Sequence, residues 1–370
     1  MKIAHLISSR GVFGAEKVVL SLAQHFNQAD NIAYVGVIRD NRFPLLSKDL
    51  VIVAQDLSLP TFVINSAGKL DLHTIKQLKQ FLLKNRIDIL HTHNYKSNII
   101  GIISAKMIGI PVVATVHGYT TATVNVSFYE IMDRCILPFF NRVVVVNEKI
   151  LKYMPSRKRM VIKNGLDINA FLKNDKKRLN FRKRFNIGEN ETVIGTAARL
   201  SKEKNQQMLI RALEKLLANS NNIKLLIAGT GEQRDKLQGM LEQRGLTHAV
   251  VFTGFIQDMT EFYSGIDIFV LSSNTEGIPM VILEAMASGV VVVATKVGGI
   301  PEIVIDNKTG LLVEAGDVVG LADVVKKLID NRKIWDRLTV NALEFIKKHF
   351  SIELMMQHYY NMYISCHKTI

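Results

Sequence analysis

The chain has few of the residues that build disulfide or metal frameworks: of its 370 residues, only Cys135 and Cys366 are cysteines. Two cysteines cannot form a disulfide scaffold, and neither lies at a spacing typical of a metal site, which suits a reducing compartment. The sequence also lacks an uninterrupted apolar run of about 20 residues, which argues against a membrane-spanning helix. The apolar start at Lys2–Ile7 is too short for a signal peptide. These absences predict a cytoplasmic protein.

Acidic residues are scarce beside basic ones: 33 Asp and Glu stand against 47 Lys and Arg, a formal net charge of +14. Such an excess favours an anionic partner. The basic residues concentrate at Arg157–Arg159 and Lys173–Arg184. They form either solvated helix faces or an attachment surface for anionic lipid, so peripheral association with the inner face of the cell membrane is one hypothesis. No aromatic stacking platform accompanies the charge, so nucleic acid is not an expected partner.

What the chain does have is a repeated alternation of short apolar strands and helices. Near-continuous apolar strands separated by helices are typical of a parallel sheet covered on both faces. Strands are predicted at Lys2–Ile7, Ile32–Ile38, Phe62–Ile64, Asp88–His91, Val112–Val116, Val143–Val146 and Met160–Ile162, with helices at Ala15–Phe26, Asp71–Lys84 and Tyr95–Ile108. The pattern restarts with strands at Thr192–Ala197, Lys224–Ala228, Val250–Thr253, Ile268–Leu271, Val290–Ala294 and Leu311–Val313.

The sequence therefore predicts an α/β fold of two doubly wound, Rossmann-like domains facing across a cleft. The domains are expected at 1–165 and 166–350. The last segment, Leu321–Ile370, reads as helical with a break near Phe350. Its end, 351–370, is expected to return to the first domain.

The most informative stretch is Ser272–Gly289, which leaves a predicted strand, turns at Gly277 and enters a helix near Pro279. Proline is favoured in a first helical turn, and a helix N-terminus offers free N–H groups and a positive dipole to a diphosphate. Glu276 and Glu284 can accept hydrogen bonds from the hydroxyls of a sugar and of a ribose. The simpler interpretation makes them a helix cap and a solvated helix residue.

Four further motifs follow other strands of the second half, where ligands bind in open parallel sheets. Arg199 and Lys204 can neutralise a diphosphate without a metal, although a solvated turn would look the same. The remaining motifs are the glycine-rich turn Ala228–Glu232, the segment Gly254–Ile256, which can meet a base edge, and the loop Gly298–Glu302. Each signal is weak alone, but together they mark one rim.

These motifs resemble the family-4 glycosyltransferases of GT-B architecture, from the N-terminus to about residue 315. In that family, the residue matching Glu276 contacts donor-sugar hydroxyls and the one matching Glu284 contacts ribose, whereas Arg199 and Lys204 match the pair that holds the diphosphate. The resemblance implies catalytic roles for His117, Arg199, Lys204 and Glu276, and donor-binding roles for Gly14, Gly229, Gly231, Phe255, Ile256, Gly277, Ile278, Pro279, Met280 and Glu284.

The first half contributes fewer signals. Gly14 lies in a loop similar to the family's N-terminal glycine loop, although Phe13 replaces one of its two usual glycines. His117 matches a histidine that, in relatives, bonds a donor-sugar hydroxyl or helps to position the reacting groups. His91 and His93 alternate onto one face, and a metal site is possible on spacing alone. No third ligand is visible in the sequence and relatives carry the pair without a catalytic metal, so we expect no metal and no cofactor.

The resemblance implies a retaining, metal-independent transfer from a UDP- or GDP-type sugar to a hydroxyl of a glycan or lipid-linked acceptor. Synthesis of a cell-surface polysaccharide or lipopolysaccharide is the expected setting. Acceptor choice is assigned to the loops at Phe43–Pro60 and Thr120–Ser127. Two alternatives stay open: a nucleotide-sugar epimerase, which would convert the donor without an acceptor, and a basic nucleic-acid-binding protein, whose RNA binding would depend steeply on salt.

Overall fold

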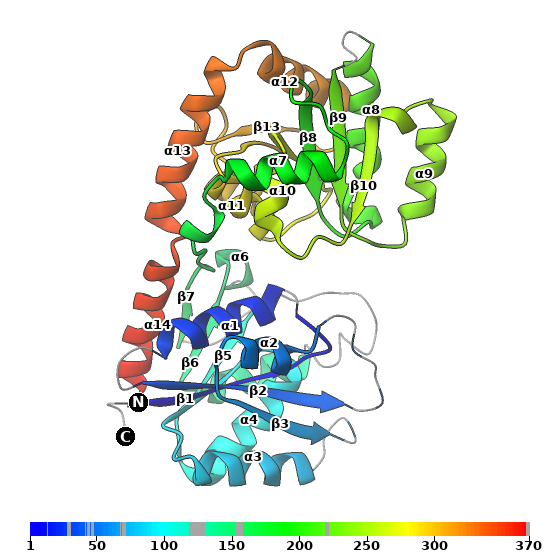
Figure 1. Cartoon of the computed structure of the whole chain (residues 1–370). Helices are drawn as coiled ribbons and strands as arrows, with labels where there is room; N and C mark the ends of the chain where they lie inside the picture. Colours follow the sequence, from blue (N-terminus) through cyan, green and yellow to red (C-terminus); the bar gives the residue numbers. More distant parts are fainter. Residues whose placement is uncertain are drawn as a thin grey trace. The chain divides into compact units, whose positions relative to one another are not determined.

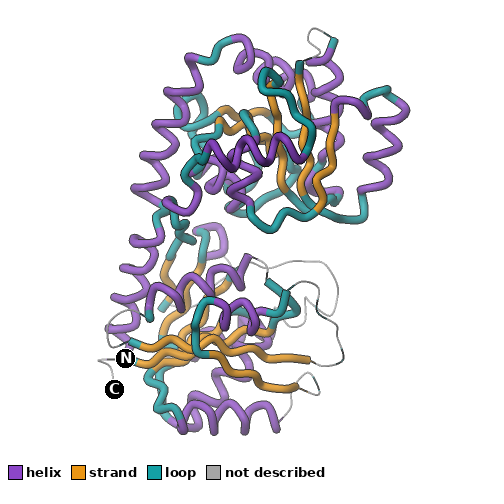
Figure 2. Tube along the Cα trace, in the orientation of Figure 1, coloured by secondary structure: helices purple, strands orange, loops and turns teal. Residues whose placement is uncertain are grey.

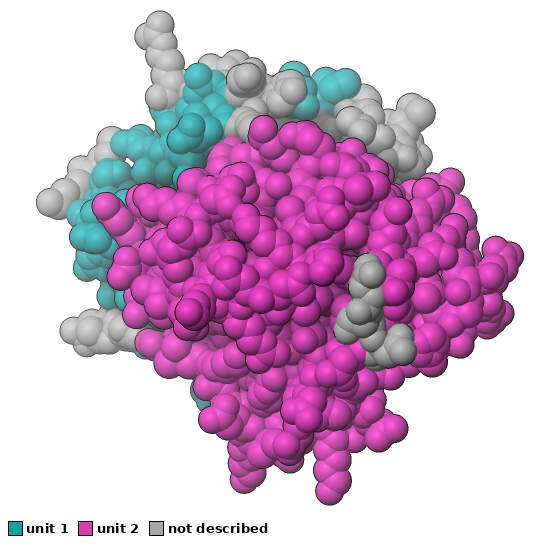
Figure 3. All heavy atoms as spheres, turned by 90° about the horizontal axis from the view of Figure 1, so that it is seen from above, with its two compact units in different colours: residues 1–165, 353–370 teal, residues 166–352 magenta. Residues whose placement is uncertain are grey.

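The computed structural model describes residues 1–12, 14–27, 31–40, 42, 45, 48–66, 68, 72–117, 131–151, 158–218 and 222–367. They form two compact units, coloured separately in Figure 3: unit 1 is Met1–Gly165 with Glu353–Ile370, and unit 2 is Leu166–Ile352. The sequence-based division at 1–165 with 351–370, and 166–350, differs from this one by two residues at the second crossing.

Unit 1 is a parallel sheet with the strand order β3-β2-β1-β4-β5-β6-β7 (Figure 1). Its strands are β1 Lys2–Ser8, β2 Ile32–Asp40, β3 Thr61–Ser66, β4 Ile89–Thr92, β5 Val112–Val116, β6 Arg142–Val145 and β7 Arg159–Val161. Its helices include α1 Gly14–Phe26, α2 Leu50–Asp56, α3 Leu72–Lys84, α4 Tyr95–Ile108, α6 Glu148–Leu151 and α14 Ile352–His367.

Helices cover both faces of this sheet, which is why its central strands are buried along nearly their whole length (Figure 2). On one face, Leu78 of α3 and Ile100 of α4 pack in a common core with Leu6 and other strand residues. On the other face, the Tyr363 hydroxyl of α14 lies 2.6 Å from Nδ1 of His91. The prediction that the C-terminal helix returns to the first domain is therefore confirmed.

Unit 2 is a second parallel sheet, with the order β10-β9-β8-β11-β12-β13. Its strands are β8 Thr192–Ala197, β9 Ile223–Ala228, β10 Val250–Gly254, β11 Ile268–Leu271, β12 Val291–Thr295 and β13 Leu311–Val313. Its helices include α7 Asp175–Arg184, α8 Gln206–Leu217, α9 Arg234–Gln243, α10 Met259–Gly265, α11 Met280–Ala287, α12 Val318–Asp330 and α13 Lys333–His349.

The predicted strands all form, with ends within two residues of those expected. The C-terminal helical segment breaks twice. The break predicted near Phe350 follows α13, which ends at His349, and a further break that was not predicted follows α12, which ends at Asp330. Within the described part of the chain, no helix is both long and apolar enough to cross a membrane.

The basic segment Lys173–Arg184 is only in part the solvated face that one sequence interpretation assigned to it: Lys173, Lys176 and Lys183 are exposed, whereas other cations are held by ion pairs. Most of it is α7, whose Arg182 is only 5% exposed. Four of its cations form ion pairs inside unit 2: Lys177 with Asp258, Arg178 and Arg182 with Asp267, and Arg184 with Glu261. The sequence did not reveal these pairs because the acids lie far along the chain: Asp258 caps α10, Glu261 lies in its first turn and Asp267 follows it. Arg157, from the other basic cluster, lies outside the described residues.

Candidate active site

The order of strands creates a switch point in unit 2 between β8 and β11. From β8 the chain winds through β9 to β10 on one side, whereas from β11 it winds through β12 to β13 on the other. Loops that leave two neighbouring strands in opposite directions open a crevice at the carboxyl edge of the sheet, where open α/β sheets bind ligands. The loop after β8 carries Arg199 and Lys204, and the loop after β11 carries Glu276.

Lys204 and Glu276 meet at this switch point. Their Nζ and Oε1 atoms are 2.7 Å apart, and the Glu276 side chain is only 8% exposed. The same carboxylate oxygen accepts a hydrogen bond of 2.7 Å from Ser273 Oγ. A carboxylate with two donors and little solvent is held in one orientation, as a group that must meet a ligand hydroxyl needs to be.

Backbone and amide contacts tie the two loops together. The backbone N–H of Asn274 donates to the Glu203 carbonyl at 2.8 Å, and Ser272 Oγ donates to the Asn205 carbonyl at 3.0 Å. Asn205 itself has a left-handed backbone, with φ of 48°, at the start of α8. Asparagine tolerates this region better than most residues. The Lys204–Glu276 pair is therefore built on a braced junction.

The glycine-rich turn after β9 lies against the loop after β8. A Cβ on Gly229 would come within 2.0 Å of the Ala198 carbonyl oxygen, and one on Gly231 within 2.3 Å of the Leu200 carbonyl oxygen. The Gly229 N–H also donates to the Gly254 carbonyl at 2.8 Å. These glycines serve close backbone packing, so they shape the rim beside Arg199.

The loop after β12 braces the opposite side. Gly298 has φ of 55°, and a Cβ there would lie 1.8 Å from the Glu276 carbonyl oxygen. The Gly299 N–H donates to the Gly277 carbonyl at 2.9 Å. Only a glycine allows both the left-handed backbone and this approach. The turn that carries Glu276 and Gly277 therefore packs directly against the backbone of Gly298 and Gly299.

Helix α11 begins at Met280, with Pro279 at its N-cap rather than inside the first turn. No side chain caps this N-terminus, and its first turn holds no acidic residue. A helix start left without a side-chain cap presents backbone N–H donors and a partial positive charge. Gly277, Ile278, Pro279 and Met280 therefore lie at a point suited to an anionic group.

Glu284 is buried, at 6% exposure, so its interpretation as a solvated helix residue is wrong. The hydroxyl of Tyr263, from α10, donates to Oε2 of Glu284 at 2.9 Å and also approaches the Val281 carbonyl oxygen at 3.1 Å. Burial, together with the nearby Glu284 charge, raises the pKa of Tyr263 well above its usual value, so the hydroxyl stays a donor. Sequence reasoning missed Tyr263, since nothing in its local motif links it to Glu284.

Other predicted donor residues are less constrained. Arg199 is 69% exposed and pairs with Glu203 at 2.6 Å, so its guanidinium is not joined to the Lys204–Glu276 pair. Phe255 is 77% exposed, whereas its neighbour Ile256 is buried in the core. An exposed aromatic ring beside the rim offers a flat apolar face.

In unit 1, the corresponding switch point lies between β1 and β4. Gly14 begins α1 after the β1 loop, and Asn94, after β4, ties the two loops by donating to the Ser8 carbonyl at 2.7 Å. His117 directly follows β5, and burial lowers its pKa to about 4. Gly118, Tyr119 and the acceptor segment Thr120–Ser127 lie outside the described residues.

The sequence-based view that no third imidazole accompanies His91 and His93 is wrong. His5 is paired in register with His91 across β1 and β4, and ligand atoms of the three histidines all lie within 4.8 Å of one another. The two nitrogens of His91, however, already contact hydroxyl groups of Tyr363 and Thr115, at 2.6 and 2.7 Å. The predicted alternation of His91 and His93 onto one face is confirmed by their ring centroids, 4.1 Å apart.

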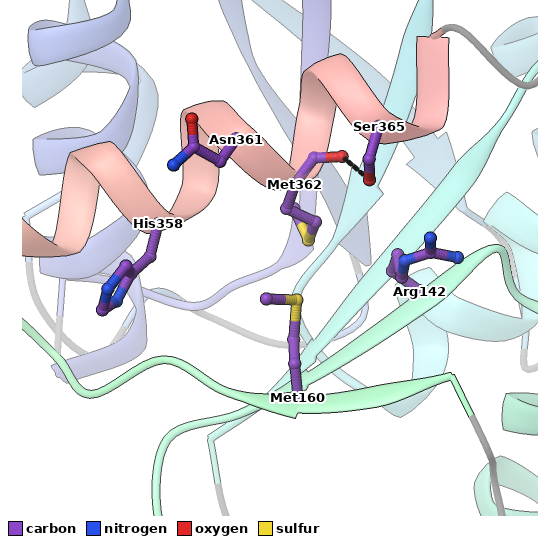
Figure 4. Close-up of a pocket in the computed structure, with 6 residues that line it drawn as sticks. All are labelled: Arg142, Met160, His358, Asn361, Met362 and Ser365. Carbon is purple, nitrogen blue, oxygen red and sulfur yellow. Dashed lines mark hydrogen bonds between the residues drawn. The ribbon is translucent and has the colours of Figure 1, made fainter.

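A hollow of about 250 Å³ elsewhere in unit 1 is drawn in Figure 4. It is lined by Arg142 and Met160 from the sheet and by His358, Asn361, Met362 and Ser365 of α14. None of the predicted site residues lines it, and the Ser365 hydroxyl is already bonded to the Met362 carbonyl oxygen. The candidate site therefore rests on the strand-end loops.

Two doubly wound α/β units in one chain are the arrangement of the GT-B glycosyltransferases, and unit 2 gathers a cation, a carboxylate and an uncapped helix start at its switch point. Residues 12–170 match the family model described as Glycosyltransferase Family 4, and residues 177–345 match that described as Glycosyl transferases group 1. The chain is a family-4 glycosyltransferase of GT-B architecture.

Relatives of known name agree with this assignment. The chain is 28% identical to N-acetyl-alpha-D-glucosaminyl L-malate synthase of Bacillus anthracis, over 79% of this chain and 78% of the relative. It is 25% identical to the UDP-Gal:alpha-D-GlcNAc-diphosphoundecaprenol alpha-1,3-galactosyltransferase of Escherichia coli, over 98% and 97%. HepE of Anabaena, solved with UDP, shares the fold, with a TM-score of 0.85, 22% identity and coverage of 99% and 100%.

Proposed function

We propose that this enzyme transfers a sugar, with retention of anomeric configuration and without a metal ion, from a UDP-type donor to a hydroxyl of a glycan or lipid-linked acceptor. The setting we favour is the synthesis of a cell-surface polysaccharide. Support for the donor and acceptor classes comes from the Escherichia coli relative, which is named for a UDP-sugar and a diphosphoundecaprenol-linked acceptor, and from the UDP complex of HepE.

The observation that carries the proposal is the Lys204–Glu276 pair, 2.7 Å long, beside the uncapped start of α11. A leaving nucleoside diphosphate needs positive charge, which Lys204 and the helix N–H groups supply. The sugar that is transferred needs hydrogen-bond acceptors for its hydroxyls, and Glu276 supplies them. Gly277 is exposed, and a Cβ at this position would meet no atom within 4 Å. Packing within the protein therefore does not require a glycine here. A ligand that approaches the backbone closely explains that glycine.

In this mechanism the protein acts mainly through electrostatics. Lys204, Arg199 and the N-terminus of α11 stabilise the charge that develops on the diphosphate, while Glu276 orients the sugar as its ring gains oxocarbenium character. Glu284, held by Tyr263 at 2.9 Å, meets the ribose hydroxyls. No side chain acts as a nucleophile, and the leaving phosphate accepts the proton of the acceptor hydroxyl.

A thermal-shift panel tests the donor. UDP, GDP and ADP, alone and as sugar conjugates, are added to matched samples with and without EDTA. We expect stabilisation by UDP and UDP-sugars: at a ligand concentration 100 times Kd, binding contributes about 2.7 kcal/mol. Stabilisation by GDP compounds alone would overturn the UDP proposal, and a shift that EDTA abolishes would overturn metal independence. The anomeric configuration of the product, read by NMR, tests retention.

Arg199→Ala tests the charge contribution with little risk to folding, since this side chain is 69% exposed. We expect kcat to fall roughly 10²-fold, near the low end for losing one group that stabilises transition-state charge. Arg244→Ala is the matched control, because Arg244 also pairs with a surface glutamate, Glu214, away from the strand-end loops. Equal kinetics for the two variants would count against a role for Arg199.

Association with an anionic membrane surface stays a separate prediction. The ion pairs of α7 leave fewer cations for lipid than the sequence suggested, so the segment is a weaker candidate. Sedimentation with vesicles of neutral or acidic lipid tests it directly. Binding that does not rise with the acidic fraction would remove the prediction. Conversion of a UDP-sugar to its epimer in the absence of acceptor would instead favour the epimerase alternative.

A further inference from the structure

Three imidazoles in unit 1 form a continuous chain that ends at His117. Nδ1 of His5 lies 3.0 Å from Nε2 of His93, and Nδ1 of His93 lies 3.4 Å from Nε2 of His117. The residues come from β1, from the end of β4 and from the end of β5, which are neighbours in the sheet. This chain of three histidines therefore runs from the buried part of unit 1 to the carboxyl edge of the strands in its sheet.

Burial keeps these imidazoles neutral. It lowers the pKa of His5 to about 3 and that of His117 to about 4, and it lowers the pKa of His93 well below its usual value. A neutral imidazole has one N–H donor and one acceptor nitrogen. The hydrogen bonds of the chain can therefore all point toward His117 or all point away from it, and the position of one proton sets the others.

The buried end of the chain decides the direction. Nε2 of His5 is buried, and no described residue hydrogen-bonds to it. With its proton on Nε2, His5 would bury an N–H without an acceptor, a rare arrangement in native structures. With the proton on Nδ1, His5 donates to Nε2 of His93. His93 then carries its own proton on Nδ1 and donates to Nε2 of His117.

His91 stands beside this chain without belonging to it. Its Nδ1 and Nε2 atoms lie 2.6 Å from the Tyr363 hydroxyl and 2.7 Å from the Thr115 hydroxyl. These contacts anchor the ring to α14 and β5 and leave neither nitrogen free for a metal ion. The same contacts make His91 a suitable control, since it is a buried histidine of the same cluster.

We propose that His93, backed by His5, is a positioning residue that holds His117 as its Nδ1–H tautomer. Nε2 of His117 is occupied as an acceptor, so the group left to meet a ligand is a hydrogen-bond donor. A donor suits the oxygen of a sugar hydroxyl, whereas the other tautomer would offer a lone pair. This inference rests on the proposed function and on the contact with a donor-sugar hydroxyl that the family resemblance implies for His117.

NMR of protein labelled with ¹³C and ¹⁵N at histidine tests the tautomer without any assay of activity. The His117 signal is identified by its loss in His117→Ala. We expect Nδ1–H for His117 in the wild type, a shift toward Nε2–H in His93→Phe, and no change in His91→Phe. A wild-type His117 protonated on Nε2, or one indifferent to His93→Phe, would overturn the proposal. So would a change of the His5 and His93 signals on adding Zn²⁺, because it would identify the imidazoles as metal ligands.

Kinetics add a second readout. His93→Phe should lower kcat about tenfold while leaving the Kd for UDP unchanged, since the nucleotide is assigned to unit 2. His93→Asn, whose amide can donate near the position of Nδ1, should recover most of that loss. Equal losses in the two variants would overturn the positioning role. If no nucleotide binds the wild type, the proposed function fails, and the NMR result still decides the tautomer.

Discussion

Acid should destabilise unit 1 far more steeply than unit 2. In unit 1, His5, His91 and His93 are buried and His117 is half-buried, and desolvation lowers the pKa of all four, to about 3 for His5 and about 4 for His117. The histidines of unit 2, by contrast, are exposed. Each of the four histidines in unit 1 stays neutral in the folded protein but takes up a proton when the protein unfolds. The free energy of unfolding therefore falls as the pH drops below the unfolded pKa, about 6.5.

The size of the effect follows from proton linkage. Between pH 6 and pH 5 the unfolded form of each histidine takes up protons that the folded form does not, which costs about 1.2 kcal/mol per residue and about 5 kcal/mol for four. The loss continues until the pH approaches the folded pKa values. A domain is stable by about 5–15 kcal/mol, so unit 1 should be close to unfolding near pH 5.

Two probes separate the units. The only tryptophan, Trp335, lies in α13 and reports on unit 2 by fluorescence, whereas hydrogen exchange of the amides in β1, β4 and β5 reports on unit 1. Urea unfolding is followed with both at pH 7, 6 and 5. His91→Gln, which removes one of the four groups, should reduce the acid-dependent loss by about a quarter. A loss below 1 kcal/mol in unit 1 from pH 6 to 5 would refute the reasoning.

Two substitutions in unit 2 test its bracing. Gly298→Ala should weaken UDP binding tenfold or more in a thermal-shift titration, because its Cβ would meet the Glu276 carbonyl oxygen at 1.8 Å. The control is Gly289→Ala, since Gly289 also has a left-handed backbone but open space around its Cβ position. Equal effects would refute the clash. Asp267→Asn should cost unit 2 about 3–5 kcal/mol in urea unfolding, since it leaves the buried Arg182 uncompensated. A cost below 1 kcal/mol would contradict that role.

Much of the architecture was predictable because it is written in local patterns. Apolar β-branched runs such as Val112–Val116 predict buried parallel strands, and glycine turns after them predict the ligand edge. The pair Glu276 and Glu284 carried the family resemblance, which the family models confirm. Conversely, the sequence could not separate a free basic helix from α7, whose Arg178 and Arg182 are paired with Asp267, far along the chain.

The sequence by itself determined which residues stand at strand ends, because strand, turn and helix preferences act over a few neighbouring residues. Only the tertiary structure decided which of them meet. Lys204 joins Glu276 since β8 and β11 are neighbours, Tyr263 reaches Glu284 by the packing of α10 near α11, and His5 completes the histidine chain through its register with β4. Parallel strands are joined through crossover helices rather than tight turns, so their order and pairing depend on packing between segments far apart in the sequence.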